Sequence, residues 1–241
     1  MLLVFTMSFN KDFSKESIKE GEVFIIDKPL NYTSFQVVKK LRSVLKKKFM
    51  LNKLKVGHAG TLDPLASGLL IICTGRMTKQ ISDFQNLDKE YVGTMSIGST
   101  TPSYDLETKV DRTFSTNHIT QDLLYKIKNN FIGTIDQFPP IFSAVKKNGK
   151  RLYEYAREGK KIDIKSKKIT INKFDLKSIC MPKIDFEVNC SKGTYIRSLI
   201  NDFGKELNSG AHLISLRRTK IGSFSINRSI TLDEFIEKFS V

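Results

Sequence analysis

The feature that most constrains the fold is a run of alternating residues in the second half of the chain. Across residues 184–190, Ile, Phe, Val and Cys occupy every second position, and Asp, Glu and Asn lie between them. Successive side chains of a strand point to opposite faces, so this pattern predicts a strand with one buried and one solvated face. Residues 90–97 and 169–176 alternate well enough to be further half-buried strands. Shorter apolar runs at 23–26 and 69–73 predict buried strands.

Helical patterns lie between these strands. Thr33-Ser34-Phe35-Gln36 has the spacing of a capping box, and apolar residues follow it at helical period: Phe35, Val38, Leu41, Leu45 and Phe49. Two more helices are expected over 120–131 and 196–207, and a short one begins at Thr231. Strands and helices interleave without strict alternation. We therefore expect an α+β fold, with a mixed, mainly antiparallel central sheet flanked by helices.

The chain shows no obvious division into separate domains. Its 241 residues contain no repeat, low-complexity tract or Gly/Ser linker. We expect residues 1–20 to be a flexible N-terminal tail and residues 21–241 to form one domain. The segment at about 137–163 is basic and aromatic and reads as an insertion. Long ordered loops in compact domains are usually functional.

Several protein classes are excluded. No stretch approaches the roughly 18 apolar residues of a membrane span, and the apolar start lacks the flanks of a signal peptide. The cysteines, Cys73, Cys180 and Cys190, are sparse and form no C-x-x-C, which favours a reducing cytoplasm and argues against a thiolate zinc site. The histidines also lack metal-ligand spacing: His58, His118 and His212.

The charge points to a polyanionic partner. Lys and Arg number 40 against 25 Asp and Glu, a formal net charge of +15. Nucleic acid is the first candidate partner and an anionic membrane surface the second. No acidic residue lies between Asp27 and Asp63, a second basic block spans 146–168, and a third holds Arg217 and Arg218. Such patches could follow a folded phosphate backbone, although Lys46–Lys48 alone could be a solvated helix face.

The segment Gly57–Leu70 is the most unusual in the chain. Its glycines and proline specify a bent backbone, with Asp63 in the middle. An aspartate before proline is commonly only a turn residue. A carboxylate among basic surfaces, however, would repel a bound phosphate backbone unless chemistry required it.

This segment resembles the catalytic-loop signature of the TruB family of tRNA pseudouridine synthases, G-H-x-G-x-L-D-P-x-A-x-G-x-L. Other segments of the chain resemble further motifs of the same family and occur in the family's order. They are Asp27-Lys28-Pro29, Lys89-Glu90-Tyr91, Gln137-Phe138-Pro139-Pro140, Cys190-Ser191-Lys192-Gly193-Thr194-Tyr195-Ile196-Arg197 and Leu216-Arg217-Arg218-Thr219. The resemblance covers residues from about 22 to 226.

The resemblance implies isomerisation of uridine 55 in the T-loop of tRNA to pseudouridine, in a pseudouridine synthase catalytic core. The reaction loses no atoms or electrons, so no metal or redox cofactor is expected. The expected partner is tRNA, through its T-loop and stem. A monomer without an obligate protein partner is expected.

The chemistry needs one carboxylate. Breaking a glycosidic bond requires a carboxylate near C1′, as nucleophile or as stabiliser of positive charge. The enzyme must retain its leaving group, so a second carboxylate activating water would be harmful. By resemblance the acid is Asp63, which attacks the sugar or removes a sugar proton to form a glycal; both routes stay open.

The resemblance also assigns the other site residues. Tyr91 would stack on the flipped uracil, Tyr195 would assist C5 deprotonation, and Arg197 would pair with the catalytic acid. Leu216 would form an apolar wall of the base pocket. Expected RNA-binding residues are His58, Lys28, Lys39, Lys40, Lys146, Lys147, Arg151, Arg217 and Arg218.

The resemblance also suggests roles for three residues outside the catalytic set. His58 would occupy the space that flipped bases leave, and Lys28 would also brace the catalytic loop. Asp105 matches a family aspartate of structural or RNA-positioning role, but Pro102 and Thr108 depart from the expected Asp and Gly.

The C-terminus departs from the longer family pattern. Many bacterial members carry a small RNA-binding domain of PUA type after the core, and too few residues follow Phe224 for it. Two alternatives remain: a non-catalytic RNA-binding or tRNA-folding factor, and the catalytic subunit of a guide-RNA-directed particle. Loss of activity on substituting Asp63 would distinguish an enzyme from a non-catalytic RNA-binding factor. Activity without a guide RNA would exclude the guide-directed particle.

Overall fold

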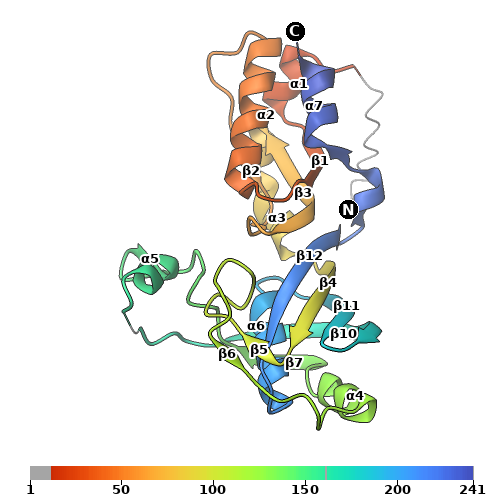
Figure 1. The fold of residues 1–241 in the computed structure, drawn as a ribbon. Helices are drawn as coiled ribbons and strands as arrows, with labels where there is room; N and C mark the ends of the chain where they lie inside the picture. Colours follow the sequence, from red (N-terminus) through yellow and green to blue (C-terminus); the bar gives the residue numbers. More distant parts are fainter. Residues whose placement is uncertain (1–11, 161, 241) are drawn as a thin grey trace. The chain divides into compact units, whose positions relative to one another are not determined.

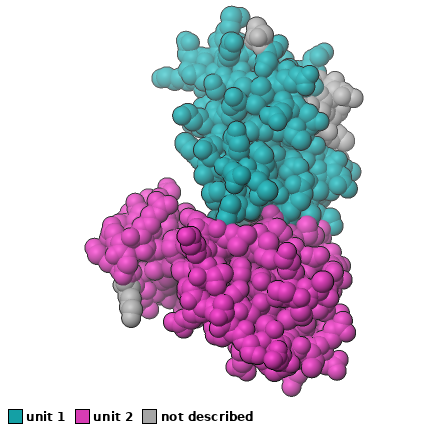
Figure 2. Space-filling model, in the orientation of Figure 1, with its two compact units in different colours: residues 1–87, 217–241 teal, residues 88–216 magenta. Residues whose placement is uncertain are grey.

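The computed structural model describes residues 12–160 and 162–240 and divides into two compact units. Unit 1 comprises residues 1–87 and 217–241, and unit 2 comprises residues 88–216 (Figure 2). Strand β12 (Ala211–Ile221) begins in unit 2 and ends in unit 1 (Figure 1). The expectation of a single domain from residue 21 stays a prediction.

Unit 1 contains a sheet with both faces covered. Its helices are α1 (Lys15–Glu20), α2 (Ser34–Lys48), α3 (Ile81–Asn86) and α7 (Leu232–Phe239), with 3₁₀ turns η1 (Gly75–Gln80) and η2 (Ile226–Arg228). Its strands are β1 (Val23–Lys28), β2 (Val56–His58), β3 (Ala66–Thr74), β13 (Phe224–Ser225), β14 (Ile230–Thr231) and the C-terminal part of β12. The strand order is β14-β1-β3-β12, with β2 on β3 and β13 on β12. β1 pairs parallel with β14 and antiparallel with β3.

The apolar runs at β1 and β3 explain this arrangement. Phe24 and Ile26 join one core cluster with α1, α2 and α7, while Val23 and Ile25 join another with α3. A strand buried on both faces reads as a continuous apolar run, as the sequence predicts here. Within α2, Val38, Leu41 and Leu45 are buried as expected, but Phe35 is 63% exposed.

The N-terminal segment differs from its prediction. Residues 1–11 of the expected tail lie outside the described residues. Residues 15–20 form α1, capped by Ser14, and Ile18 is fully buried in the core. The described part of the expected tail thus contains a short capped helix, and Phe13, just before it, also packs against the core.

Unit 2 combines an antiparallel sheet with helices, of which α4 and α6 pack near β10. Its strands are β4 (Lys89–Ile97), β5 (Ser99–Thr100), β6 (Arg112–Thr113), β7 (Gly133–Gln137), β8 (Lys146–Lys147), β9 (Lys150–Arg151), β10 (Lys167–Cys180), β11 (Lys183–Cys190) and the N-terminal part of β12. Its helices are α4 (Gln121–Asn129), α5 (Leu152–Arg157) and α6 (Ile196–Glu206). The order is β12-β4-β11-β10-β7, and β4, β11, β10 and β7 pair antiparallel with their neighbours in this series.

The alternation in β11 works as the sequence predicts. Ile184, Phe186 and Val188 are buried, and Phe203 of α6 contacts Phe174 of β10 with ring centroids 5.6 Å apart. The same registers place polar residues on the opposite face. The expected α+β fold with a mainly antiparallel sheet is confirmed.

Candidate active site

The loop that carries Asp63 joins β2 to β3, both in unit 1. The residues on either side of Asp63 are held by Asn31, before α2, and by Ser34, the first residue of α2. Ser34 Oγ donates to the Leu62 carbonyl at 3.1 Å and accepts from the Leu62 amide at 2.8 Å. The Asn31 amide donates to the Pro64 carbonyl at 2.8 Å. Asp63 itself is partly exposed, so a fixed backbone presents an accessible carboxylate.

Lys28, at the end of β1, braces the same region from inside. It is fully buried, and its Nζ donates to the carbonyls of Pro29 at 2.9 Å and Tyr32 at 2.6 Å. Burial lowers the pKa of Lys28 from 10.5 to about 8; the neighbouring Arg218 lowers the pKa further, and the Asp63 and Asp27 carboxylates partly oppose the change.

Arg218 connects the start of the loop to strand β3. Its Nε donates to the Leu69 carbonyl at 2.8 Å and one terminal nitrogen donates to the Gly60 carbonyl at 3.1 Å. Only 1% of Arg218 is exposed. Its backbone also approaches β3 closely, since a Cβ on Gly68 would lie 2.3 Å from the Arg218 carbonyl oxygen. The bent segment therefore needs glycine at position 68.

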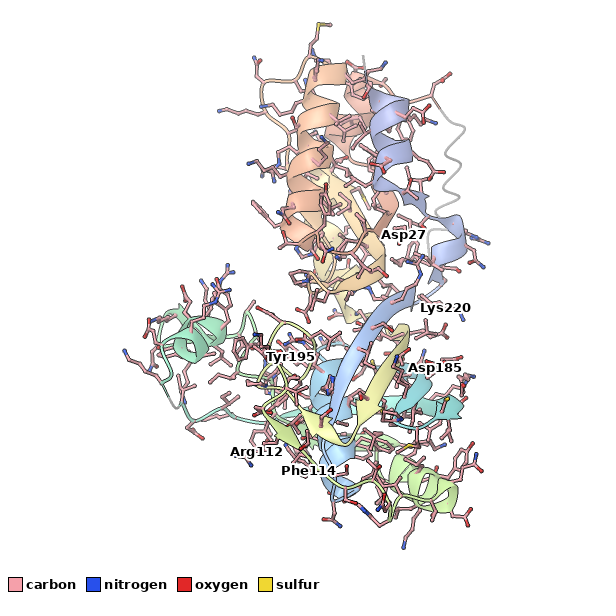
Figure 3. The ribbon with its side chains drawn as sticks, viewed as in Figure 1. Asp27, Arg112, Phe114, Asp185, Tyr195 and Lys220 are labelled. Carbon is pink, nitrogen blue, oxygen red and sulfur yellow. The ribbon has the colours of Figure 1, made fainter. Side chains whose placement is uncertain are left out.

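Arg217 points away from Arg218, as consecutive strand residues must. It forms a two-point ion pair with Asp27, with nitrogen–oxygen distances of 2.6 and 3.0 Å, and it donates to Ser67 Oγ at 3.3 Å. Asp27 is labelled in Figure 3. His58, at the end of β2, is half-buried, and burial followed by the charge of Arg218 lowers the pKa of His58.

Two of the residues expected to contact RNA, Lys28 and Arg218, lie in the interior, where their charged groups bind backbone carbonyls. In these positions they hold the Asp63 loop. Arg217 is partly exposed and keeps access to solvent, although Asp27 already pairs with it.

The remaining expected catalytic residues lie in unit 2. Tyr91 is on β4, is 8% exposed and pairs in register with Val188 of β11. Tyr195, labelled in Figure 3, is the N-cap residue of α6. Gln137 binds its backbone on both sides: the Tyr195 amide donates to Oε1 at 2.8 Å, and Nε2 donates to the Tyr195 carbonyl at 3.1 Å.

Arg197 is held by a polar network within unit 2. It is 4% exposed; its Nε lies 3.5 Å from Asp105 Oδ2, and one terminal nitrogen donates to the Ser103 carbonyl at 3.1 Å. The other Asp105 oxygen accepts the Glu107 amide at 3.0 Å. Asp105 therefore orients Arg197. The sequence alone did not decide whether Asp105 has a structural role or positions the RNA. By resemblance Arg197 is expected to pair with the catalytic acid, and that pairing stays a prediction.

The other expected residues occupy different settings. Leu216 lies on β12 and is 9% exposed. Lys39 and Lys40 are exposed on α2. The predicted insertion contains the β8–β9 hairpin and α5, with Lys146 and Lys147 on β8 and Arg151 at the end of β9.

Aromatic and charged side chains hold this insertion together. Arg151 and Arg157 lie over the Tyr153 ring at 5.8 and 5.3 Å from its centroid, and Lys147 pairs with Asp163. Within residues 12–160 and 162–240, no cluster of three or more His, Cys, Asp or Glu residues could hold a metal ion. No helix in these ranges is long and apolar enough to cross a membrane.

The chain is similar to known proteins along almost its whole length. Residues 46–196 match the N-terminal domain of TruB family pseudouridylate synthases, and residues 197–240 match the C-terminal domain of tRNA pseudouridylate synthase B. The tRNA pseudouridine synthase B of Flavobacterium johnsoniae is 57% identical over 223 residues, covering 92% of this chain and 97% of the relative. That of Parabacteroides distasonis is 49% identical over 221 residues, covering 90% and 94%.

A solved structure also resembles the chain. The crystal structure of a Cbf5-Nop10-Gar1 complex contains a chain that is 29% identical, with a TM-score of 0.69. The match covers 91% of the present chain but only 54% of that chain, so the present chain spans about half its length.

Proposed function

The chain belongs to the TruB family of pseudouridylate synthases, and on that premise we propose that it isomerises uridine 55 in the T-loop of tRNA. Its relatives are named tRNA pseudouridine synthase B, so the chain is an isomerase that acts on tRNA. The position of the uridine, and the role of each residue, are the proposed part. The fixed backbone around a partly exposed Asp63 is the observation that carries the proposal.

The reaction rearranges bonds on one nucleotide. The C1′–N1 bond breaks, the uracil turns and a C1′–C5 bond forms. C5 then loses its proton, and N1 gains a proton. The target nucleotide must leave its stack for these atoms to be reached. Asp63 acts at the sugar, either by forming an ester at C1′ or by removing the C2′ proton, and both routes need it ionised.

The family resemblance gives the remaining residues their proposed roles. Lys28 keeps a buried cation beside the Asp63 loop. Arg197 supplies a second cation, which Asp105 and the Ser103 carbonyl hold in one orientation. Tyr91 stacks on the flipped uracil, Tyr195 assists proton loss at C5, and Leu216 lines the base pocket.

In this proposal, the cations at the surface bind the RNA. Lys39, Lys40, Lys146, Lys147 and Arg151 contact phosphates of the T-loop and stem, Arg217 adds charge, and His58 fills the space left by flipped bases. Phosphate contacts release counterions, so the affinity should fall steeply with salt. We place the enzyme in the cytoplasm with tRNA, as a monomer that needs no cofactor and no protein partner.

The decisive experiment is Asp63→Asn on a T-loop transcript. The substitution keeps size and shape but removes the charge, and we expect a loss of at least about a thousandfold in rate. RNA binding and the unfolding midpoint should stay close to those of the native chain. Pseudouridine formation that survives the substitution would contradict the catalytic assignment and favour a non-catalytic RNA-binding factor.

Two further measurements locate the reaction. Replacing uridine 55 by cytidine in a full tRNA transcript should abolish modification, and a product at another uridine would reject the proposed position. Activity on bare transcript separates this enzyme from a guide-directed one. The Cbf5 chain of the similar structure is found with Nop10 and Gar1, whereas we expect the present chain to act alone.

A further inference from the structure

An exposed aromatic surface lies on the turn between β1 and α2 and on the first residues of α2. Within residues 30–35, here called the aromatic turn, Leu30 is 55%, Tyr32 42% and Phe35 63% exposed. Single exposed apolar residues are common on protein surfaces. Three within six residues, two of them aromatic, are unusual in a segment that the catalytic chemistry does not use.

The aromatic turn is fixed to the Asp63 loop. Asn31 adopts a left-handed conformation with φ of 64°, and its amide binds the carbonyl of Pro64, next to Asp63. The Tyr32 carbonyl accepts a hydrogen bond from the buried Lys28. Ser34 binds both backbone groups of Leu62, on the other side of Asp63. The backbone on either side of Asp63 and the backbone that carries the exposed rings are therefore held by the same hydrogen bonds.

The aromatic turn also borders the acid-free basic region. Phe35 is the second residue of α2, and Lys39 is one helical turn further along the same face. Both are exposed, while Val38 and Leu41 face the core. No Asp or Glu lies between Asp27 and Asp63. Exposed rings beside cations form the kind of surface that binds single-stranded nucleic acid.

We propose that Tyr32 and Phe35 form a stacking platform for an unpaired base of the RNA substrate, adjacent to the nucleotide that Asp63 acts on. The proposal rests on the proposed function, since it takes RNA as the occupant. The basic setting favours RNA over an apolar protein partner. A base that leaves its stack loses stacking energy, and an aromatic ring on a segment that is hydrogen-bonded to the Asp63 loop restores part of it.

The test compares alanine variants with matched controls in steady-state kinetics on a T-arm transcript. Tyr32→Ala and Phe35→Ala should each raise KM about tenfold, the effect expected for losing one base–ring stack, with kcat changed far less. Tyr125→Ala removes a ring of similar exposure, 43%, from α4, and Met50→Ala removes an 83% exposed side chain beyond the end of α2. Both controls should keep the native KM.

Conservative variants separate stacking from other contacts. Phe35→Trp should restore the native KM, whereas Phe35→Leu should not, because leucine offers apolar area without a π-face. Loss of a stack should also leave the slope of log K against log salt unchanged. A fluorescent 2-aminopurine placed in turn at each loop position should be quenched at one position by the native chain and not by Phe35→Ala.

Three results would overturn the platform. They are a KM for both alanine variants within twofold of the controls, full affinity in Phe35→Leu, or a reduced salt slope. Failure of the proposed function is recognised separately, because it appears as modification of a uridine other than 55 by the native chain. The KM comparison then applies to whichever RNA the native chain modifies.

Discussion

The cations around the Asp63 loop and those of the insertion at 137–163 differ in what they bind. Lys28 and Arg218 are buried and donate to backbone carbonyls of the segments that hold the loop. In the insertion, Lys147 pairs with Asp163, and Lys150 and Lys160 pair with Glu158, all on the surface.

The difference separates two uses of positive charge. A buried cation whose partners are carbonyls cannot be removed without leaving those carbonyls unsatisfied in the interior. An exposed ion pair contributes little to stability and can exchange a carboxylate for a phosphate. The first kind shapes the catalytic loop, and the second kind is available to RNA.

The largest effect is expected for Arg218→Met. Methionine fills similar space but leaves the Leu69 and Gly60 carbonyls without the guanidinium, at a cost of about 3 kcal/mol or more in unfolding free energy. Urea denaturation measures the change. The control, Arg217→Met, loses a partly exposed pair with Asp27 and should cost about 1 kcal/mol. Equal losses in the two variants would contradict the distinction.

Gly68→Ala should come next. Gly68 has φ of +105°, and a Cβ there would lie 2.3 Å from the Arg218 carbonyl oxygen, a backbone atom that cannot move aside. We expect a loss of about 2–3 kcal/mol and reduced activity. Gly193→Ala is the matched control, because Gly193 has φ of +81° but no atom within 4 Å of the added methyl group. Only the backbone strain of about 1–2 kcal/mol should remain there.

Lys28 predicts a pH dependence of stability. Its pKa falls from 10.5 to about 8 on folding because the ammonium is buried. Between these values the unfolded chain binds more protons than the folded one, so this group makes stability rise with pH across that window and contributes no slope below it. Lys28→Met should flatten the rise in unfolding free energy, and the exposed Lys39→Met should not. Parallel curves for the native chain and Lys28→Met would contradict the burial of this charge.

The sequence predicted strands and the Asp63 loop better than it predicted burial. Strands β1, β3 and β11 follow from local apolar patterns. Phe35 was expected in the core because it fits the helical period, but it lies on the first turn of α2, where the core-facing positions are Ser34 and Val37. The apolar period alone does not fix which residue of the first turn faces inward.

Arg217 and Arg218 show why site roles were harder to predict. As a pair they indicate a basic surface, yet in a strand they point to opposite faces. Recognising β12 would have revealed the alternation, but its residues 211–221 lack a clear apolar pattern. The partners are also distant in sequence, since Asp27 is 190 residues from Arg217 and Leu69 is 149 from Arg218. Long-range pairings of this kind come from the tertiary fold.

The smallest expected change in stability belongs to Glu158→Gln in the insertion. Glu158 pairs with Lys150 and Lys160 on the surface, and these contacts lower the pKa of Glu158. The urea midpoint should not change measurably, because water already solvates both charges. The affinity for tRNA should rise slightly at low salt, since two lysines lose a competing carboxylate. By contrast, Lys147→Met should weaken binding and reduce the salt slope by about one. If Glu158→Gln were destabilised, the charged residues of the insertion would contribute to folding stability, as those around the Asp63 loop do.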